Sequence, residues 1–233
     1  KSCEAVGMRS EHRHLKEDVS LGELMKIVEE LNADPDVTGF IVQVPLPPPL
    51  QSHLPAIIRA INPKKDIDGF GAYNLGKMFL SEEFEHLPPA TPGGIVALLE
   101  HYKIGVEGKH VVVVGRSNTV GKPIAVMLLN RDATVTVCNR HTHNLAHYTK
   151  QADILIVAVG KAGLITGDMV KDGVVVIDVG MNKTEKSLVG DCDFESVSKK
   201  ASAITPVPGG VGPMTVASLI QNCVRAKERQ SEG

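Results

Sequence analysis

Residues 109–123 read KHVVVVGRSNTVGKP, and this stretch decides the fold class of the 233-residue chain. Its valine run is typical of a strand that is buried on both faces of a sheet. Gly115 ends the run and Gly121 follows six residues later, with a helix predicted from about Val120 to Asn130. A strand, a glycine turn and a helix in this order predict the first βα unit of a nucleotide-binding lobe, because amides at a helix N-terminus attract anions.

The same pattern repeats towards the C-terminus. Three further apolar runs alternate with crossovers, one of which, near residues 143–150, is predicted to be a helix. These runs are ATVTVC (133–138), DILIVAV (153–159) and GVVVIDVG (173–180). Four buried strands that alternate with crossovers predict a Rossmann-like α/β fold with a doubly wound parallel sheet. Beyond them, residues 181–191 are predicted to form a hairpin and residues 214–227 a final helix.

The first part of the chain predicts a second, smaller α/β lobe. Its expected elements are a helix over 20–32, a strand over 39–44, a helix over 54–61 and a loop over 62–70. Ser20 and Glu23 have the spacing of a capping box at the start of the first helix. Thr91 and Pro92 are predicted to be the N-cap and first-turn residue of a helix that bridges the two lobes.

Composition excludes several classes of function. The formal net charge is -2 at pH 7, and the chain has no Trp, three Tyr and five Phe, so it lacks the basic surface and stacking platforms expected of a nucleic-acid-binding protein. Its apolar runs are far shorter than the ~18 residues needed to span a bilayer, so no membrane partner is expected. Cys3, Cys138, Cys192 and Cys223 form no CxxC pair, which indicates free thiols in the cytoplasm or an organelle matrix.

The end of the second predicted strand indicates which dinucleotide binds. An NAD-specific site usually offers Asp or Glu there, whereas this chain has Arg140. With Arg116 in the turn after the first strand, two guanidinium groups could flank a 2′-phosphate through charge-assisted hydrogen bonds. The residues therefore favour NADP as the cofactor, bound by Gly115, Arg116, Ser117 and Arg140. The alternative is that both arginines are solvated surface charges.

Six motifs stand out along the chain. They are GFIVQVPLP (39–47), PKKDIDGF (63–70), PATPGG (89–94), VVVGRSNTVGKP (112–123), VIDVGMN (176–182) and TPVPGGVGPMT (205–215). In order and spacing they resemble the bifunctional methylenetetrahydrofolate dehydrogenase/cyclohydrolase family. The resemblance covers virtually the whole chain and lacks only the family's N-terminal segment.

The resemblance implies an enzyme of one-carbon metabolism with two activities. These are NADP-dependent oxidation of 5,10-methylenetetrahydrofolate to methenyltetrahydrofolate, and hydrolysis of that product to 10-formyltetrahydrofolate. It also implies a folate lobe at residues 1–90, completed by the helix 214–233, and an NADP-binding lobe at 91–213 that includes the bridging helix and a substrate loop, 205–213. The expected partners are tetrahydrofolate derivatives and, since the family typically forms homodimers, a second copy of the chain.

The resemblance further assigns individual residues. Gln43 would support the family's reactive lysine, with Val42 and Val44 beside the substrate. A Gln in a buried strand needs partners for its amide, which a cleft supplies; the residues alone favour the alternative that nearby backbone satisfies the amide. Asp68 would accept N–H donors of the pterin. Asp66 is interpreted instead as a residue of a plain Asp-Gly turn, with no ligand. Gln43 and Asp68 are thus the catalytic candidates. The substrate loop adds Pro208, Gly209, Gly210, Val211 and Gly212, and the cofactor side adds Thr91, Met181 and Thr215.

The reactive lysine itself aligns two residues before Lys1, and Lys1 matches a second, non-catalytic lysine. Because the chain does not begin with Met, the sequence is compatible with a longer protein and with a truncated one. A truncated or catalytically dead homologue that binds NADP and folate is therefore the alternative function.

Three other interpretations carry less support from the residues. PLPPPL (45–50) contains a PxxP motif, but it directly follows an apolar run and fits the family's loop. His141, His143 and His147 have no carboxylate or Cys pattern beside them, so no metal is expected. A two-lobed oxidoreductase such as shikimate dehydrogenase lacks the TPVPGGVGPMT motif.

Overall fold

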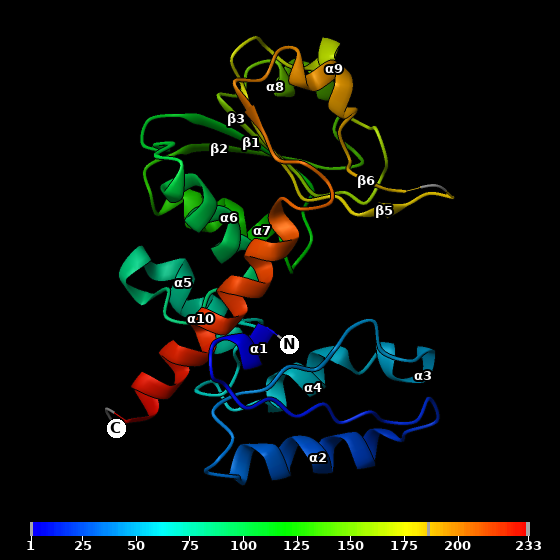
Figure 1. Cartoon of the computed structure of the whole chain (residues 1–233), viewed down its shortest axis with the longest axis vertical. Coiled ribbons are helices and arrows are strands. Elements are labelled where there is room, and N and C mark those ends of the chain that lie inside the picture. The colour runs from blue at the N-terminus through cyan, green and yellow to red at the C-terminus, as the bar shows by residue number, and fades with distance from the viewer. Residues whose placement is uncertain (1, 186, 232–233) are drawn as a thin grey trace.

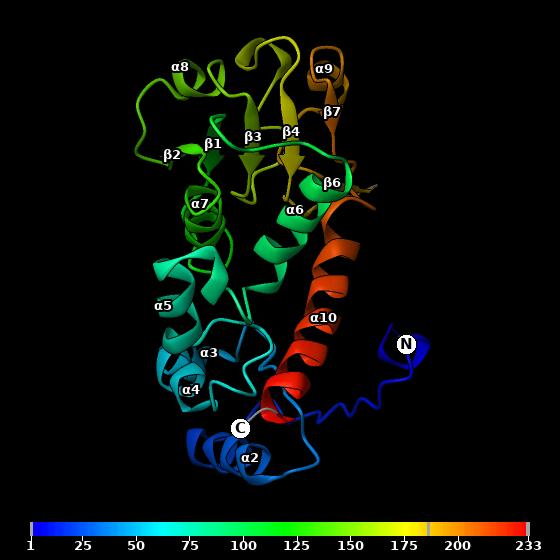
Figure 2. The same ribbon diagram turned by 90° about the vertical axis from the view of Figure 1, so that its left-hand side faces the viewer.

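The computed structural model describes residues 2–185 and 187–231 and has two lobes that are stacked along its long axis (Figure 1). One lobe contains a parallel sheet, and the other contains helices and loops from the first part of the chain. Helix α10 (Val211–Ser231) runs from the sheet lobe to the other lobe, and α6 (Ala90–His101) packs beside it (Figure 2). Among the described helices, none is both long and apolar enough to cross a lipid bilayer.

The sheet has five parallel strands in the order β2-β1-β3-β4-β7. They are β1 (His110–Val114), β2 (Thr134–Cys138), β3 (Ile154–Val157), β4 (Val175–Asp178) and β7 (Ala203–Ile204). The four apolar runs of the sequence form the first four of these strands. The predicted α/β fold is therefore confirmed, whereas β7 is missing from the prediction because two residues are too short to show a period.

The two faces of the sheet pack against different helices. Val111 and Val113 of β1 belong to one core cluster, and Val112 and Val114 belong to the other. The helices of the first cluster are α5 (Ala72–Leu80), α6, α7 (Gly121–Leu129) and the start of α10, and those of the second are α8 (Leu145–Thr149), the 3-10 helix η2 (Gly167–Met169) and α9 (Phe194–Ser198). Because both faces are buried, the strands read as continuous apolar runs rather than as alternating patterns.

The other lobe has a separate apolar core, in which Val28 and Ile57 are fully buried. The elements of the first part of the chain are α1 (Ser2–Ala5), α2 (Leu21–Ala33), α3 (Pro48–Gln51), α4 (Leu54–Ala60) and, after α5, the 3-10 helix η1 (Glu82–Phe84). At the start of α2, Ser20 Oγ accepts the Glu23 N–H, and the Glu23 carboxylate accepts the Ser20 N–H. The predicted helices in this lobe and the capping box are therefore confirmed.

The predicted strand 39–44 is wrong. Only Phe40 makes a β-bridge, to Asp66, through a hydrogen bond from its N–H to the carbonyl oxygen of Lys65. An extended apolar segment becomes a strand only when a second strand pairs with it. In the part of the chain that the structure describes, no strand lies beside this segment.

Helices α6 and α10 approach each other closely because α6 has two glycines on the facing side. A Cβ at Gly94 would lie 2.7 Å from the carbonyl oxygen of Met214, and one at Gly93 would lie 2.7 Å from Ser218 Oγ. The glycines of the PATPGG motif therefore have a packing role, which is to let the two long helices touch.

The start of α6 differs from the prediction. The helix begins at Ala90 with Pro89 as its cap, so Thr91 is not the N-cap. The Thr91 hydroxyl lies instead 3.0 Å from the hydroxyl of Thr215 on α10. A side chain that looks like a local cap in the sequence thus makes a contact between two helices.

The C-terminal elements follow the prediction with one shift. Strands β5 (Asn182–Lys183) and β6 (Leu188–Val189) form the predicted antiparallel hairpin, of which residue 186 lies outside the described residues. Helix α10 begins at Val211, three residues before the predicted start. Proline is tolerated in the first turn of a helix, so Pro213 does not delay its start.

Candidate functional site

The sheet has a topological switch point between β1 and β3. From β1 the chain crosses to β2 on one side and later returns to β3 on the other side. In doubly wound folds, ligands bind outside the carboxyl ends of the strands at such a point. The strand ends are level, since Val114 lies opposite both Cys138 and Val157.

Gly115 and Gly121 are required by the close packing of the loop at this point. Gly115 has φ +125°, and a Cβ there would lie 2.2 Å from the carbonyl oxygen of Ala158, just after β3. A Cβ at Gly121 would lie 2.2 Å from the carbonyl oxygen of Gly115. The two glycines therefore let α7 start directly above the end of β1.

The N-terminus of α7 offers free amides to an anion. Among the described residues, the backbone N–H groups of residues 116–119 donate to no acceptor. Ser117 Oγ accepts the N–H groups of Val120 and Gly121 at 3.1 and 3.3 Å, which fixes the shape of the loop. The positive end of the helix dipole adds to the attraction for a phosphate.

Arg116 and Arg140 follow the paired ends of β1 and β2, each two residues beyond the matched pair Val114 and Cys138. Both side chains are exposed, and neither forms an ion pair with any described residue. Arg140 Nε donates to His141. Two uncompensated guanidinium groups at one edge of the sheet form a site that suits a doubly charged phosphate.

Two buried aspartates, which the sequence interpretation did not single out, organise the neighbouring loops. Asp178, at the end of β4, accepts the N–H groups of Gly180, Asp191 and Cys192, and desolvation by burial raises the pKa of its carboxyl. Asp191 is completely buried and accepts the N–H groups of residues 159–161, directly after β3. Their one signal in the sequence is that each is an Asp near a Gly at the end of an apolar run.

Met181 lies just beyond the turn that these aspartates hold, and its side chain is 67% exposed. An apolar side chain that remains open to solvent beside a buried polar network is available to a ligand. Met181 thus lies in the loop that follows β4, on the same edge of the sheet as Arg116 and Gly115.

The segment predicted as a substrate loop also leaves this edge of the sheet. It follows β7, and Thr205 ties it to β4, since Thr205 Oγ1 accepts the Asp178 N–H at 2.8 Å. Residues 205–210, which include Pro208, Gly209 and Gly210, are outside helices and strands, as predicted. Val211 and Gly212 are not part of the loop, however, because they form the first turn of α10.

Asp68 lies at the junction of the two lobes. The next residue, Gly69, has φ +72°, and a Cβ there would lie 2.5 Å from the carbonyl oxygen of Leu87 in the segment leading to α6. The Asp68 carboxylate makes no hydrogen bond or ion pair with any described residue, and burial together with the charge of Asp66 raises its pKa to about 6. A half-buried carboxyl without a partner is a candidate ligand-binding group.

Asp66 has the structural role expected of it. Its Oδ2 accepts the Gly71 N–H at 2.8 Å and the Asn74 side-chain amide at 2.9 Å, and the residue is 1% exposed. These bonds fix the turn that carries Asp68.

The burial expected for Gln43 is wrong. Gln43 is exposed, and its amide donates to the adjacent carbonyl of Val44 at 3.0 Å. Val44 is also exposed, whereas Val42 packs against the core of its own lobe. Since 39–44 is not a paired strand, nothing in the described residues buries the Gln43 side chain.

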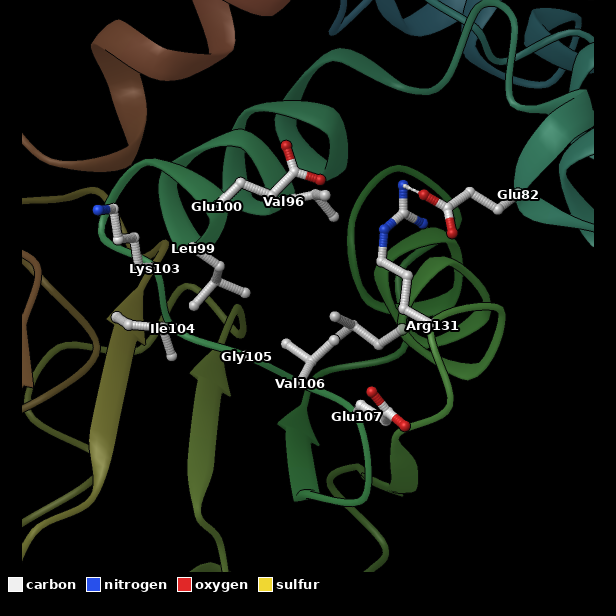
Figure 3. A pocket seen from close by; sticks show the side chains of 11 residues that line it. Glu82, Val96, Leu99, Glu100, Lys103, Ile104, Gly105, Val106, Glu107 and Arg131 are labelled. Atoms are coloured by element: carbon white, nitrogen blue, oxygen red, sulfur yellow. Dashed lines mark ion pairs between the residues drawn. The ribbon is translucent and has the colours of Figure 1, made fainter.

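A hollow of about 440 Å³ lies elsewhere, at the amino end of β1 (Figure 3). The lining residues come from α6, from the segment before β1 and from the end of α7, with Arg131 paired to Glu82 at its rim. None of the residues that the sequence assigns to cofactor or substrate is among them. The hollow is at the opposite end of the sheet from the switch point.

Comparison with known proteins decides the family. The model of the tetrahydrofolate dehydrogenase/cyclohydrolase catalytic domain matches residues 1–68, and that of the NAD(P)-binding domain matches residues 89–231. The chain belongs to the tetrahydrofolate dehydrogenase/cyclohydrolase family. The resemblance given by the six motifs is thereby confirmed.

Relatives of the tetrahydrofolate dehydrogenase/cyclohydrolase family cover nearly all of this chain. The bifunctional protein FolD of Moorella thermoacetica is 52% identical over 98% of this chain and 81% of its own length. The crystal structure of the bifunctional enzyme FolD from Campylobacter jejuni matches with a TM-score of 0.91 and 48% identity, over 98% of this chain and 80% of its own. The Trypanosoma brucei enzyme, whose structure is complexed with an NADP cofactor and an inhibitor, matches with a TM-score of 0.94 and 35% identity, over 100% of this chain and 80% of its own.

The match to the family's NAD(P)-binding domain covers the whole sheet lobe. The residues matched by the NAD(P)-binding domain, 89–231, include the whole five-stranded sheet and the loops at its carboxyl end. The switch point between β1 and β3 is therefore inside the family's dinucleotide-binding domain.

Proposed function

We propose that this protein oxidises 5,10-methylenetetrahydrofolate to methenyltetrahydrofolate with NADP, and that the protein hydrolyses the product to 10-formyltetrahydrofolate. Family membership supports both activities. The choice of NADP rests on one observation. Arg116 and Arg140 are exposed, follow the level ends of β1 and β2, and form no ion pair with any described residue.

The residues of the cofactor edge fit NADP. Arg116 and Arg140 would hold the 2′-phosphate, and the free amides of residues 116–119 would hold the pyrophosphate. Ser117 keeps those amides in place by accepting two N–H groups of the helix start. Met181 would pack against the dinucleotide. When bound, NADP supplies the acceptor for the hydride that leaves the methylene carbon.

Asp68 and the loop that leads into α10 are proposed to hold the folate. An ionised Asp68 can accept two N–H donors of the pterin, and no described residue competes for it. Pro208, Gly209 and Gly210 would lie against the folate, with Val211 and Gly212 adding the free amides of the first turn of α10 rather than a flexible loop. The hydroxyl pair Thr91 and Thr215 would face the cofactor side and fix the spacing of the two helices there.

For the hydrolysis step, Gln43 is proposed to turn towards the reactive lysine of the family, which aligns before Lys1. The present hydrogen bond of its amide, to the neighbouring carbonyl of Val44, is local and exposed. Such a bond exchanges with water at little cost, so the amide is free to rebind. Val42 and Val44 would then lie beside the substrate.

The folate lobe is proposed to comprise residues 1–90 with 214–233, and the NADP lobe residues 91–213. Contacts of α10 with the first lobe support this division, since Asn222 donates to the carbonyl oxygens of Ile67 and Pro88. A homodimer follows the family, and the four free cysteines support the cytoplasm.

The direct test is NADP reduction at 340 nm with methylenetetrahydrofolate as the substrate, followed by the loss of methenyltetrahydrofolate. We expect turnover with NADP at a higher kcat/KM than with NAD. Binding of both ligands without any turnover would instead support the catalytically dead homologue, and the intact mass of the protein would show whether the chain extends beyond 24.9 kDa.

A further inference from the structure

Asp191 has a buried carboxyl group that accepts hydrogen bonds from N–H donors only. Its Oδ2 accepts the backbone N–H groups of Val159 and Gly160 at 2.7 and 3.0 Å, and its Oδ1 accepts that of Lys161 at 2.8 Å. The side-chain amide of Asn182 donates to Oδ1 at 2.9 Å. One carboxylate therefore binds four donors, three from the loop that follows β3 and one from the start of β5.

The loop bound by Asp191 lies at the switch point. The residue before it, Ala158, donates its N–H to the carbonyl of Val114, and its own carbonyl oxygen occupies the space that a side chain on Gly115 would need. Residues 159–161 are thus the immediate neighbours of the glycine turn after β1. They are anchored from the inside by Asp191 while Val159, Gly160 and Lys161 are all exposed on the outside.

The arrangement depends on the two acceptor oxygens of Asp191. Three consecutive N–H groups converge on the two carboxylate oxygens. Both oxygens must therefore act as acceptors. An Asn in this place would present an NH₂ group to at least one N–H and leave that donor without its present acceptor. Loop 159–161 would then have to move to find another acceptor, because all three of its N–H groups are bound by Asp191 alone.

A second carboxylate holds Asp191 in place. Asp178 Oδ1 accepts the backbone N–H of Asp191 at 2.9 Å and that of Gly180 at 3.0 Å. Gly180 is packed so tightly that a Cβ on it would lie 2.3 Å from the Asp191 carboxyl carbon. The loops after β3 and β4 are therefore held to each other by these two side chains, in addition to the backbone hydrogen bond from the Val179 N–H to the Val157 carbonyl oxygen.

We propose that Asp191 is a positioning residue of the cofactor site, which sets loop 159–161 in the shape that forms the β3 side of the dinucleotide-binding crevice. The proposal rests on the proposed function, because it takes the switch point to be where NADP binds. Asp191 touches neither cofactor nor substrate in this scheme, and it acts only through the loop.

The test compares Asp191→Asn with Asp153→Asn in the full-length protein. Asp153 also accepts a backbone N–H, from His110 at 2.8 Å, and pairs with Lys171, but it lies at the amino end of β3 and so is a control at the opposite edge of the sheet. Because the chain has no Trp, NADPH fluorescence can be titrated without interference from indole. For Asp191→Asn we expect the Kd for NADPH to rise about tenfold or more, with KM for NADP raised and KM for the folate unchanged. Asp153→Asn should keep the wild-type Kd.

The outcomes separate this inference from the proposed function. A wild-type protein that does not bind NADPH would overturn the proposed function itself. A wild-type protein that binds NADPH, together with an Asp191→Asn variant of equal Kd, would overturn only the positioning role. An equal rise in Kd for both variants would also overturn it, since the effect would then come from general loss of stability. If Asp191→Asn does not fold, Asn182→Ala removes one donor and keeps the carboxylate, so weaker NADPH binding supports the role and unchanged binding refutes it.

Discussion

Replacing Gly115 by Ala tests the packing of the cofactor loop directly. A Cβ at this position would lie 2.2 Å from the carbonyl oxygen of Ala158, whereas real Cβ contacts essentially never fall below 3.0 Å. The clash is with backbone, so one of the two loops has to shift by roughly 0.8 Å or more, close to the ~1 Å displacement that can cost a hundredfold in rate. We therefore expect kcat/KM for NADP to fall between about tenfold and a hundredfold.

Two other glycines separate the causes of this loss. Gly108 has φ +66° and no atom within 4 Å of an added Cβ, so Gly108→Ala has only the cost of a left-handed backbone, about 1–2 kcal/mol. Gly121 has no positive φ, but an added Cβ would lie 2.2 Å from the carbonyl oxygen of Gly115. Gly121→Ala therefore introduces a steric clash without backbone strain. The assay is NADP reduction together with the Tm of each variant.

We expect Gly115→Ala and Gly121→Ala to lose activity and Gly108→Ala to lose only stability. Wild-type kcat/KM in Gly115→Ala would refute the reasoning, because the loop would then tolerate the shift. An equal loss of activity in Gly108→Ala would also refute it, since that loss would come from stability and not from the position of the loop.

Changing Arg116 or Arg140 to Ala should lower the ratio of kcat/KM for NADP over NAD by about tenfold each, and an unchanged ratio would contradict their contact with the 2′-phosphate. Asp68→Ala should lose folate turnover. Burial raises the pKa of the wild-type Asp68 carboxyl to about 6, so the wild-type protein is most stable below the ordinary pKa of Asp and loses that stability as the pH rises through 6. Asp68→Asn, which stays neutral, should therefore be more stable than the wild type above pH 6. Urea unfolding at pH 4 and pH 8 measures this, and equal differences at both pH values would show that the carboxyl is not desolvated. Asn222→Ala removes two buried hydrogen bonds from α10 to the backbone carbonyls of Ile67 and Pro88 and should lower the free energy of unfolding by about 2 kcal/mol in urea, where a change near zero would mean that water replaces them.

Local patterns predicted the elements whose cause is local. The valine run before Gly115, the helix after Gly121 and the capping box at Ser20 all depend on neighbours within a few residues, and all are present. The tetrahydrofolate dehydrogenase/cyclohydrolase family was also readable, because its motifs are long and their glycines and prolines are set by backbone geometry.

The errors arose where a distant segment decides the outcome. Thr91 has the features of an N-cap, but the partner of its hydroxyl is Thr215, more than a hundred residues away. Gln43 was expected to be buried because its neighbours are valines, yet no described strand pairs with residues 39–44. Burial and strand pairing are properties of the assembled chain, so a short pattern constrains them only weakly.

By itself the sequence determined the family and favoured NADP: it has the motifs of the family, glycines where the backbone must approach closely, and an arginine instead of a carboxylate after the second strand. Only the tertiary structure decided which of these residues lie together at one edge of the sheet. The order β2-β1-β3-β4-β7 creates the switch point, and the convergence of three amides on Asp191 sets the loop beside it. Both depend on contacts between residues far apart in the chain, which the spacing of residues along the sequence does not specify.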